Sequence, residues 1–257
     1  PTATNGPALD NFDLFNFYNF FKNLSSPQNT GQDINFLQQF IDNNRLTTSD
    51  IPGIEILNCP IEADEIKLVI KGLKNNKSSG PDLISNEMIK SLNDKGIQVI
   101  QKLYNHCLES GAYPWHESII TPLHKSGDRH DPDKYRAIAV SSCLGKTFST
   151  ILLNRMLEFR KEHCPDTAAQ LGFCKGAQTN DHILTLKTII DKYRSQKPGK
   201  LLACFVDLRK AFDSVCRTAL LYKLTKLGIR GNFFCVLENM YKNSVARIKL
   251  SGKMSEL

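Results

Sequence analysis

The sequence predicts a mixed α/β protein of the α+β kind. Three observations predict it: apolar residues recur at helical spacing in several segments, a strand–turn–strand pattern runs through residues 118–140, and an apolar run of strand length ends at an aspartate at residue 207. With 257 residues, 41% hydrophobic and 23% charged, the chain is long enough to bury a substantial core. Disorder throughout is excluded.

The charge of the chain is basic and unevenly placed. Its 33 Lys and Arg exceed its 26 Asp and Glu by seven, although residues 1–60 hold two cations against six carboxylates, which leaves +11 for the remainder. A positive field of this size favours a polyanion or an anionic membrane surface as partner, and the alternative is a solvated Lys-rich face. No apolar stretch approaches the roughly 18 to 20 residues of a membrane span, so we expect no membrane insertion and no secretion.

The eight cysteines are scattered, with no Cys-x-x-Cys pair. We therefore expect free thiols in a reducing, intracellular compartment, in cytoplasm and nucleus. His163 beside Cys164, with Cys174 ten residues on, lacks a fourth metal ligand. The sequence has neither a Gly-x-Ser-x-Gly motif nor a phosphate-cradling Gly-rich loop, so hydrolase chemistry is not expected.

The first 58 residues differ in composition from the rest and hold seven of the fourteen phenylalanines. Four apolar residues at helical spacing (Phe17, Phe20, Phe21 and Leu24) predict a helix docked onto a larger body; the alternative is a partner-binding segment. The polar run at residues 25–35 predicts a linker.

Helices are predicted next. Acidic residues in a first turn followed by Ile66, Val69, Ile70 and Leu73 predict an amphipathic helix from residue 60 onward. A Gly-Pro loop then leads into a helix capped by Ser85, and a helix over residues 97–108 is expected to end near Gly111.

The second half of the chain is predicted to contain both strands and helices. A hairpin with a long basic tip is predicted at residues 118–140, and an apolar run at 201–206 predicts a central, fully buried strand. Helices are expected at residues 143–162, 182–193, 219–227 and 233–241, followed by a short strand at 246–250.

Three features could carry chemistry. Asp207 stands at the end of the apolar run and is a candidate magnesium ligand, although a lone aspartate there is more often a cap or an ion-pair partner. The hairpin holds Lys125 and Arg136, and a planar guanidinium can grip a phosphate with two hydrogen bonds; the alternative is a solvated hairpin. The stiff turn of KSSGPD, residues 77–82, could contact a phosphate backbone.

Taken in order, four segments resemble the reverse transcriptase domain of non-LTR (LINE-like) retrotransposons. NNKSSGPDLISNEMIK is similar to the family's N-terminal motif, SIITPLHKSGDRHDPDKYRAIAVSSCLGK to its first fingers motif, AAQLGFCKGAQTNDHIL to its second, and LACFVDLRKAFDSV to the palm motif. Together they span about residues 60–215. An unrelated α/β protein would require this order to be coincidence.

The resemblance implies a right-hand polymerase that copies RNA into DNA with two Mg²⁺ (or Mn²⁺) ions. Its partners would be an RNA template, a DNA primer, a deoxynucleoside triphosphate (dNTP) and the element RNA, with no membrane. Asp207 would bridge the ions, the Leu208 carbonyl would be a further ligand, and the N–H groups of Lys210 and Ala211 would meet the triphosphate. Phe212 would be the steric gate against a ribose 2′-OH.

The resemblance also assigns the fingers. Lys125 and Arg136 would clamp the incoming triphosphate. The residues expected to contact nucleic acid are Lys77, Ser78, Gly80 and Lys175. Two positions depart from the family, because Leu83 stands where Gly is usual and Cys174 where Arg is usual.

We expect residues 1–58 to be a linker or N-terminal extension, 59–200 the fingers, and 201–257 the first part of a palm whose antiparallel sheet is truncated. The Phe/Tyr-x-Asp-Asp turn that supplies the other metal-binding aspartates does not occur in these residues. We therefore expect an incomplete fragment that does not polymerise alone. The alternative is a non-catalytic RNA-binding remnant or domesticated copy.

Overall fold

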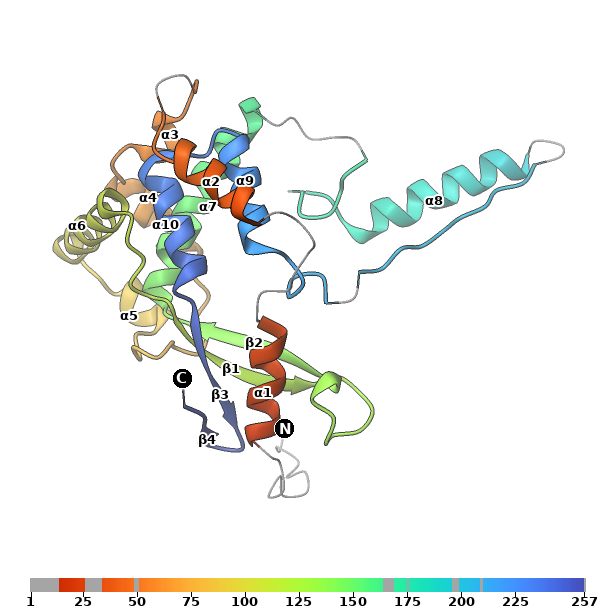
Figure 1. Ribbon diagram of the computed structural model, residues 1–257, viewed down its shortest axis with the longest axis horizontal. Helices are drawn as coiled ribbons and strands as arrows, with labels where there is room; N and C mark the ends of the chain where they lie inside the picture. Colours follow the sequence, from red (N-terminus) through yellow and green to blue (C-terminus); the bar gives the residue numbers. More distant parts are fainter. Residues whose placement is uncertain are drawn as a thin grey trace. The chain divides into compact units, whose positions relative to one another are not determined.

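The computed structural model describes residues 14–25, 34–48, 51–163, 169–174, 176–195, 199–208 and 210–256. The chain divides into two compact units, one of Pro1–Phe159 with Phe212–Leu257 and the other of Arg160–Ala211. The larger unit combines helices with a small sheet (Figure 1), which confirms the predicted α+β class.

The elements follow the predicted order closely. Before the hairpin come α1 (Leu14–Ser25), α2 (Ile34–Asn44), α3 (Glu55–Asn58), α4 (Ala63–Gly72), α5 (Asn86–Lys90) and α6 (Asp94–Ser110). After it come α7 (Cys143–His163), α8 (Thr179–Arg194), α9 (Arg217–Lys226) and α10 (Gly231–Lys242). The strands are β1 (Glu117–His124), β2 (Tyr135–Ser141), β3 (Val245–Leu250) and β4 (Lys253–Met254), with a short 3₁₀ helix η1 (Pro132–Lys134) in the hairpin.

Local signals set the helix ends as expected. The Ser85 side chain accepts a hydrogen bond from the Met88 backbone and caps α5. The Asn93 side chain does the same for α6, which ends at Gly111 in the left-handed region (φ +67°). A Cβ on Gly111 would also lie 2.7 Å from the Cβ of Cys235, so glycine is required there both by the backbone and by the packing.

The sheet has the order β2-β1-β3-β4. β1 and β2 pair antiparallel, with Ser118 opposite Ser141 and His124 opposite Tyr135. β3 lies parallel to β1, and β4 pairs antiparallel with β3. The hairpin was predicted; the parallel neighbour was not, because pairing between segments more than a hundred residues apart leaves no local periodicity.

The main core lies among the helices of the larger unit. Tyr104 on α6 and Phe148 on α7 are fully buried with ring centroids 5.0 Å apart, and the Tyr104 hydroxyl donates to the Leu144 carbonyl at 2.9 Å. Around them are buried the predicted apolar positions of α4, namely Ile66, Val69 and Ile70.

Two smaller clusters attach the N-terminal helices. Phe17 and Phe21 of α1 are buried with Ile248 and Leu250 of β3, which confirms the helix docked onto a larger body. Ile41 of α2 is buried in the other cluster, with Leu221 and Phe234. The predicted linker at residues 25–35 is mostly outside the described residues, and its last two residues are the start of α2. The predicted boundaries after residues 58 and 200 stay predictions.

The structure has no strand at residues 201–206, so the prediction of a central buried strand there is wrong. Residues 201–208 are exposed, with Phe205 and Val206 at 82% and 84%. A strand needs neighbours for its backbone N–H and C=O groups, and the described part of the smaller unit offers none.

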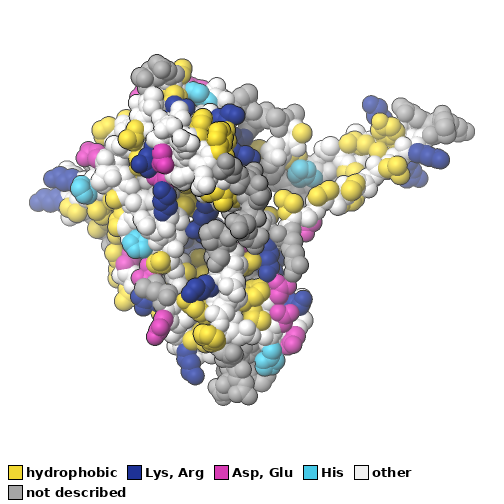
Figure 2. All heavy atoms as spheres, in the orientation of Figure 1, with side chains coloured by type: hydrophobic (Ala, Val, Ile, Leu, Met, Phe, Trp, Pro, Cys, Tyr) yellow, Lys and Arg dark blue, Asp and Glu magenta, His cyan; other side chains and the backbone are white. Residues whose placement is uncertain are grey.

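The helix α8 of the smaller unit buries no residue. Hydrophobic side chains are visible along it (Figure 2). Ile183 and Leu184 of this helix are 60% and 64% exposed. In the parts of the chain that the structure describes, no helix has the length and apolar character to cross a membrane.

Candidate nucleotide and nucleic-acid interface

The β1–β2 hairpin brings two of the predicted site residues together. Arg136 lies opposite Leu123 in the register, and the Lys125 backbone N–H donates to the Lys134 carbonyl at 2.9 Å. Since side chains alternate along a strand, Lys125 and Arg136 share the face that carries Leu123. Both cations are exposed, and neither forms an ion pair within the described residues. They are available to an anionic ligand.

The hairpin tip, residues 125–134, is held by its own side chains. The Asp128 carboxylate accepts from the His130 backbone N–H, and the Asp131 carboxylate accepts from the Asp133 N–H, both at 2.9 Å. The Tyr135 hydroxyl donates to the Arg129 carbonyl at 2.8 Å. Such Asx turns and the short 3₁₀ helix fix the backbone that carries the two cations.

The KSSGPD loop is positioned by a close approach to the end of β2. Gly80 is buried, and a Cβ there would lie 2.5 Å from the Ser142 backbone nitrogen. The Ser142 hydroxyl donates to the Asp82 carboxylate at 2.5 Å. Gly80 therefore has a packing role in this structure, whereas Lys77 and Ser78 of the same loop are exposed.

A basic groove lies beside this loop. It has a volume of about 480 Å³ and is lined by residues of α4, the KSSGPD loop, α5 and α7. Three lysines reach it: Lys74, Lys77 and Lys146. Sequence reasoning missed Lys146; the signal was present, because Lys146, Thr150 and Asn154 recur every four residues and so form one polar stripe on α7.

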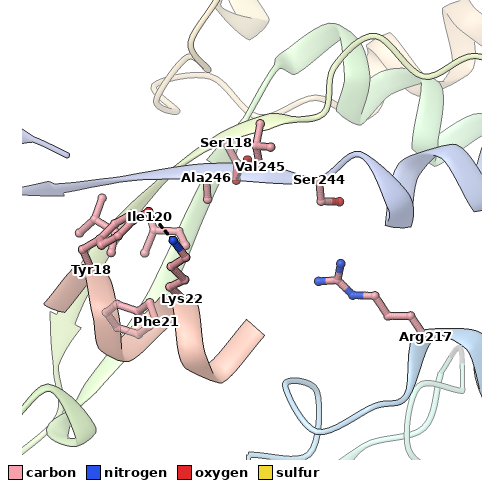
Figure 3. A pocket seen from close by; sticks show the side chains of 10 residues that line it. Tyr18, Phe21, Lys22, Ser118, Ile120, Arg217, Ser244, Val245 and Ala246 are labelled. Carbon is pink, nitrogen blue, oxygen red and sulfur yellow. Dashed lines mark hydrogen bonds between the residues drawn. The ribbon is translucent and has the colours of Figure 1, made fainter. Parts of the chain in front are cut away.

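A second groove lies between α1 and β3 and has a volume of about 440 Å³ (Figure 3). Its two cations have partners within the protein. Lys22 donates to the Tyr18 hydroxyl at 3.2 Å, drawn as a dashed line, and Arg217 donates to the Tyr241 carbonyl at 3.0 Å. Because both cations already donate hydrogen bonds to acceptors within the protein, this groove is a weaker anion site than the groove beside the KSSGPD loop.

The palm residues are not assembled into a metal site. Asp207 and Leu208 lie in the exposed segment of the smaller unit, where Ala211 is the last residue. Lys210 adopts a left-handed backbone (φ +50°), and Phe212, 81% exposed, belongs to the larger unit. No group of three His, Cys, Asp or Glu side chains suited to a metal occurs among the described residues. One carboxylate does not fit a pair of divalent ions.

Lys175, predicted to contact nucleic acid, lies outside the described residues. The roles of the other predicted site residues stay predictions.

The α+β fold, the β1–β2 hairpin and the order of the motifs agree with the class of protein that this chain resembles. The chain belongs to the family "Reverse transcriptase (RNA-dependent DNA polymerase)", which matches residues 123–256. This confirms the resemblance drawn from the sequence motifs.

The curated relatives come from mobile elements. The chain is 27% identical over 207 residues to the RNA-directed DNA polymerase from mobile element jockey of Drosophila melanogaster, a match covering 78% of this chain and 22% of the relative. It is 31% identical over 172 residues to the probable RNA-directed DNA polymerase from transposon BS of the same species, covering 65% and 19%. It is 29% identical to the Pol polyprotein from retrotransposable element R2 of Popillia japonica, covering 66% and 23%. The chain thus spans about a fifth of the length of these relatives.

Proposed function

We propose that this chain is the fingers and the first part of the palm of an RNA-directed DNA polymerase of a non-LTR retrotransposon. The observation that carries the proposal is the placement of Lys125 and Arg136 on one exposed face of the β1–β2 hairpin, inside the segment that matches the family. We name this pair the triphosphate clamp. Arg136 would hold phosphate oxygens with two parallel hydrogen bonds, and Lys125 would act as a point charge.

The template side of the proposal rests on the basic groove. Three lysines, Lys74, Lys77 and Lys146, line this groove. An RNA backbone along it would be neutralised by their charges, with release of counterions and without base-specific contacts. The DNA primer and the dNTP would be further partners of the chain. The element RNA is the proposed physiological template, and an intracellular, reducing location fits the free thiols of the seven described cysteines.

The family uses divalent metal ions, and we propose Mg²⁺ or Mn²⁺ here. Asp207 and the Leu208 carbonyl would be ligands, with the remaining carboxylates supplied by an Asp-Asp turn that these 257 residues do not contain. Such ions would supply Lewis-acid chemistry at a phosphate. Lys210 and Ala211 would present backbone N–H groups to the triphosphate, and Phe212 would exclude a 2′-OH.

The test is primer extension on an RNA template by a polypeptide that carries this chain and continues through an Asp-Asp turn. Asp207→Ala should abolish extension. Arg136→Ala should raise the KM for dNTP about 10- to 100-fold, as expected for losing charge-assisted hydrogen bonds. Glu158→Ala, a substitution on α7 outside the proposed site, serves as the control. Extension that is unchanged in Asp207→Ala would refute the proposal.

A second function is favoured by one observation: three lysines of the described residues line one groove, and RNA binding there needs no metal. A chain of this kind would bind RNA without chemistry. RNA binding by the Asp207→Ala polypeptide, with extension absent in the unsubstituted polypeptide, would select this second function.

A further inference from the structure

Tyr135 connects the hairpin tip to the N-terminal helix. It is the first residue of β2 and is 9% exposed. Its ring meets Phe17 of α1 edge to face, with centroids 4.9 Å apart, and lies 5.0 Å from the ring of His124 across the strand pair. Its hydroxyl donates to the Arg129 carbonyl in the tip. One side chain therefore contacts a helix, a strand and the tip.

Both members of the triphosphate clamp are next to these contacts in the chain. Tyr135 and His124 lie opposite each other in the register of the two strands. Arg136 directly follows Tyr135 in the chain, and Lys125 directly follows His124. Because successive side chains of a strand point to opposite faces, the two aromatic rings anchor the buried face of the hairpin while the two cations occupy the other. A shift of Tyr135 would shift the backbone that carries Arg136.

The donor role of the Tyr135 hydroxyl is secure at neutral pH. Burial raises the pKa of this phenol, and the nearby Arg129 opposes the rise only in part. The hydroxyl therefore stays protonated and keeps its hydrogen bond to the tip. Pro132, the first residue of η1, is buried and helps to fix the same backbone.

We propose that Phe17 and Tyr135 are positioning residues for the triphosphate clamp, so that the N-terminal helix α1 sets the affinity of the polymerase for dNTP. The inference rests on the proposed function and deepens it. Positioning matters because misplacement of a phosphate-binding group by about 1 Å can cost around a hundredfold in rate. No residue of α1 needs to touch the substrate.

A matched control separates positioning from simple stability. Phe21 lies on the same helix as Phe17, is 4% exposed, and belongs to the same buried cluster. Its ring is paired with Phe20 rather than with Tyr135. Phe21→Ala should therefore destabilise the protein about as much as Phe17→Ala, by removing a similar buried ring, without releasing the tip.

The experiment uses the longer polypeptide with two readouts: hydrogen exchange of the amides of residues 126–134, and KM and kcat for dNTP. Tyr135→Phe should speed exchange of the tip and raise KM, each about fivefold, with kcat within about twofold, as expected for one lost hydrogen bond. Phe17→Ala should change both in the same direction. Phe21→Ala should leave both unchanged.

Three outcomes overturn the inference and can be told apart. If the unsubstituted polypeptide extends primers but Tyr135→Phe leaves tip exchange and KM unchanged, the positioning role is wrong and the proposed function stands. If the unsubstituted polypeptide extends no primer, the proposed function fails and the role in dNTP affinity fails with it. An equal rise of KM in Phe21→Ala and Phe17→Ala would reduce α1 to a stabilising element.

Discussion

Arg155 on α7 holds Glu65 on α4 through two hydrogen bonds, from Nε to Oε2 at 2.9 Å and from Nη2 to Oε1 at 2.6 Å. The same guanidinium donates to the carbonyls of Leu57, Cys59 and Pro60. Arg155 is 6% exposed, so its charge depends on these partners rather than on water. One side chain thereby joins α7, α4, α3 and the segment that follows α3.

Removal of this guanidinium should strongly destabilise the larger unit. Arg155→Met keeps an apolar stem but removes the hydrogen bonds that Arg155 donates to Glu65 and to three carbonyls. We expect a loss of about 3 kcal/mol in the free energy of unfolding, in the range for breaking a buried pair. Chemical denaturation measures it.

The control for this substitution is an exposed ion pair of the same unit. Lys67 and Asp94 lie 2.8 Å apart, with side chains 51% and 83% exposed. Lys67→Met should cost less than about 1 kcal/mol. Equal losses for Arg155→Met and Lys67→Met would mean that burial does not strengthen the Arg155 contacts.

The pair of Arg155 and Glu65 also makes the stability of the protein depend on pH. Burial tends to raise the pKa of the Glu65 carboxyl, but hydrogen bonds from Arg155 and from the Glu62 backbone outweigh it, and the pKa lies below the ordinary value of 4.5. A carboxyl with a lower pKa in the folded state stabilises the protein at pH values above its ordinary pKa, and the contribution disappears as the pH falls through the folded pKa. Unfolding free energies measured from pH 6 to pH 3 should fall, and Glu65→Gln should make that fall shallower. If the plots of unfolding free energy against pH were parallel for the unsubstituted protein and Glu65→Gln, the pH dependence would not come from Glu65.

Leu83 stands where the resemblance drawn from the sequence leads us to expect glycine, and its backbone is strained. Its backbone has φ +60°, and its side chain is 75% exposed. The left-handed conformation costs a non-glycine residue roughly 1 to 2 kcal/mol, with little burial to offset it. Leu83→Gly should therefore increase the free energy of unfolding by about 1 kcal/mol, after subtraction of the added chain entropy of glycine. A higher thermal midpoint in a melting experiment measures this gain.

Leu83→Ala distinguishes the backbone effect from the loss of an exposed apolar side chain. Alanine keeps the Cβ that makes φ > 0 costly, so this variant should not gain stability. A gain of similar size in both variants would assign the effect to surface hydrophobicity instead.

The helices could be predicted from the sequence because their signals are local. Ile66, Val69 and Ile70 lie one or two turns apart, and Ser85 and Gly111 mark ends within a few residues of the helices they cap. The hairpin followed from alternation and turn residues in the same way. Periodicity over a short window is sufficient for all of them.

Other features depend on residues distant in sequence and could not be predicted. The parallel pairing of β1 with β3 joins Ser118 to Ala246, and Lys146 reaches the groove beside Lys77 only through tertiary packing. The error at residues 201–206 has the opposite cause: the apolar pattern was strong, but a strand also needs a neighbour for its backbone. Local pattern describes what a segment favours and not which partners it finds.

Gly80 should tolerate no side chain. A Cβ there would lie 2.5 Å from the Ser142 nitrogen and 2.6 Å from the Ser141 carbonyl carbon, and both are backbone atoms that cannot turn aside. Gly80→Ala should cost about 2 kcal/mol or more by overpacking. At Gly72, the last residue of α4, a Cβ meets no atom within 4 Å, so Gly72→Ala should be neutral or stabilising by up to about 1 kcal/mol. In thermal melts, the midpoint of Gly80→Ala should fall, and the midpoint of Gly72→Ala should stay the same or rise.

The basic groove makes a quantitative prediction about RNA. If Lys77 and Lys146 each neutralise one phosphate, the plot of log affinity against log salt for a single-stranded RNA should lose roughly 0.7 in slope with each alanine substitution. Lys102 is an exposed lysine on α6 that does not line the groove, and Lys102→Ala should leave the slope unchanged. Fluorescence anisotropy with a labelled RNA at several salt concentrations measures all three. Equal slopes in Lys102→Ala and Lys146→Ala would show that the protein attracts RNA through its overall charge, since only a defined groove makes one lysine count and another not.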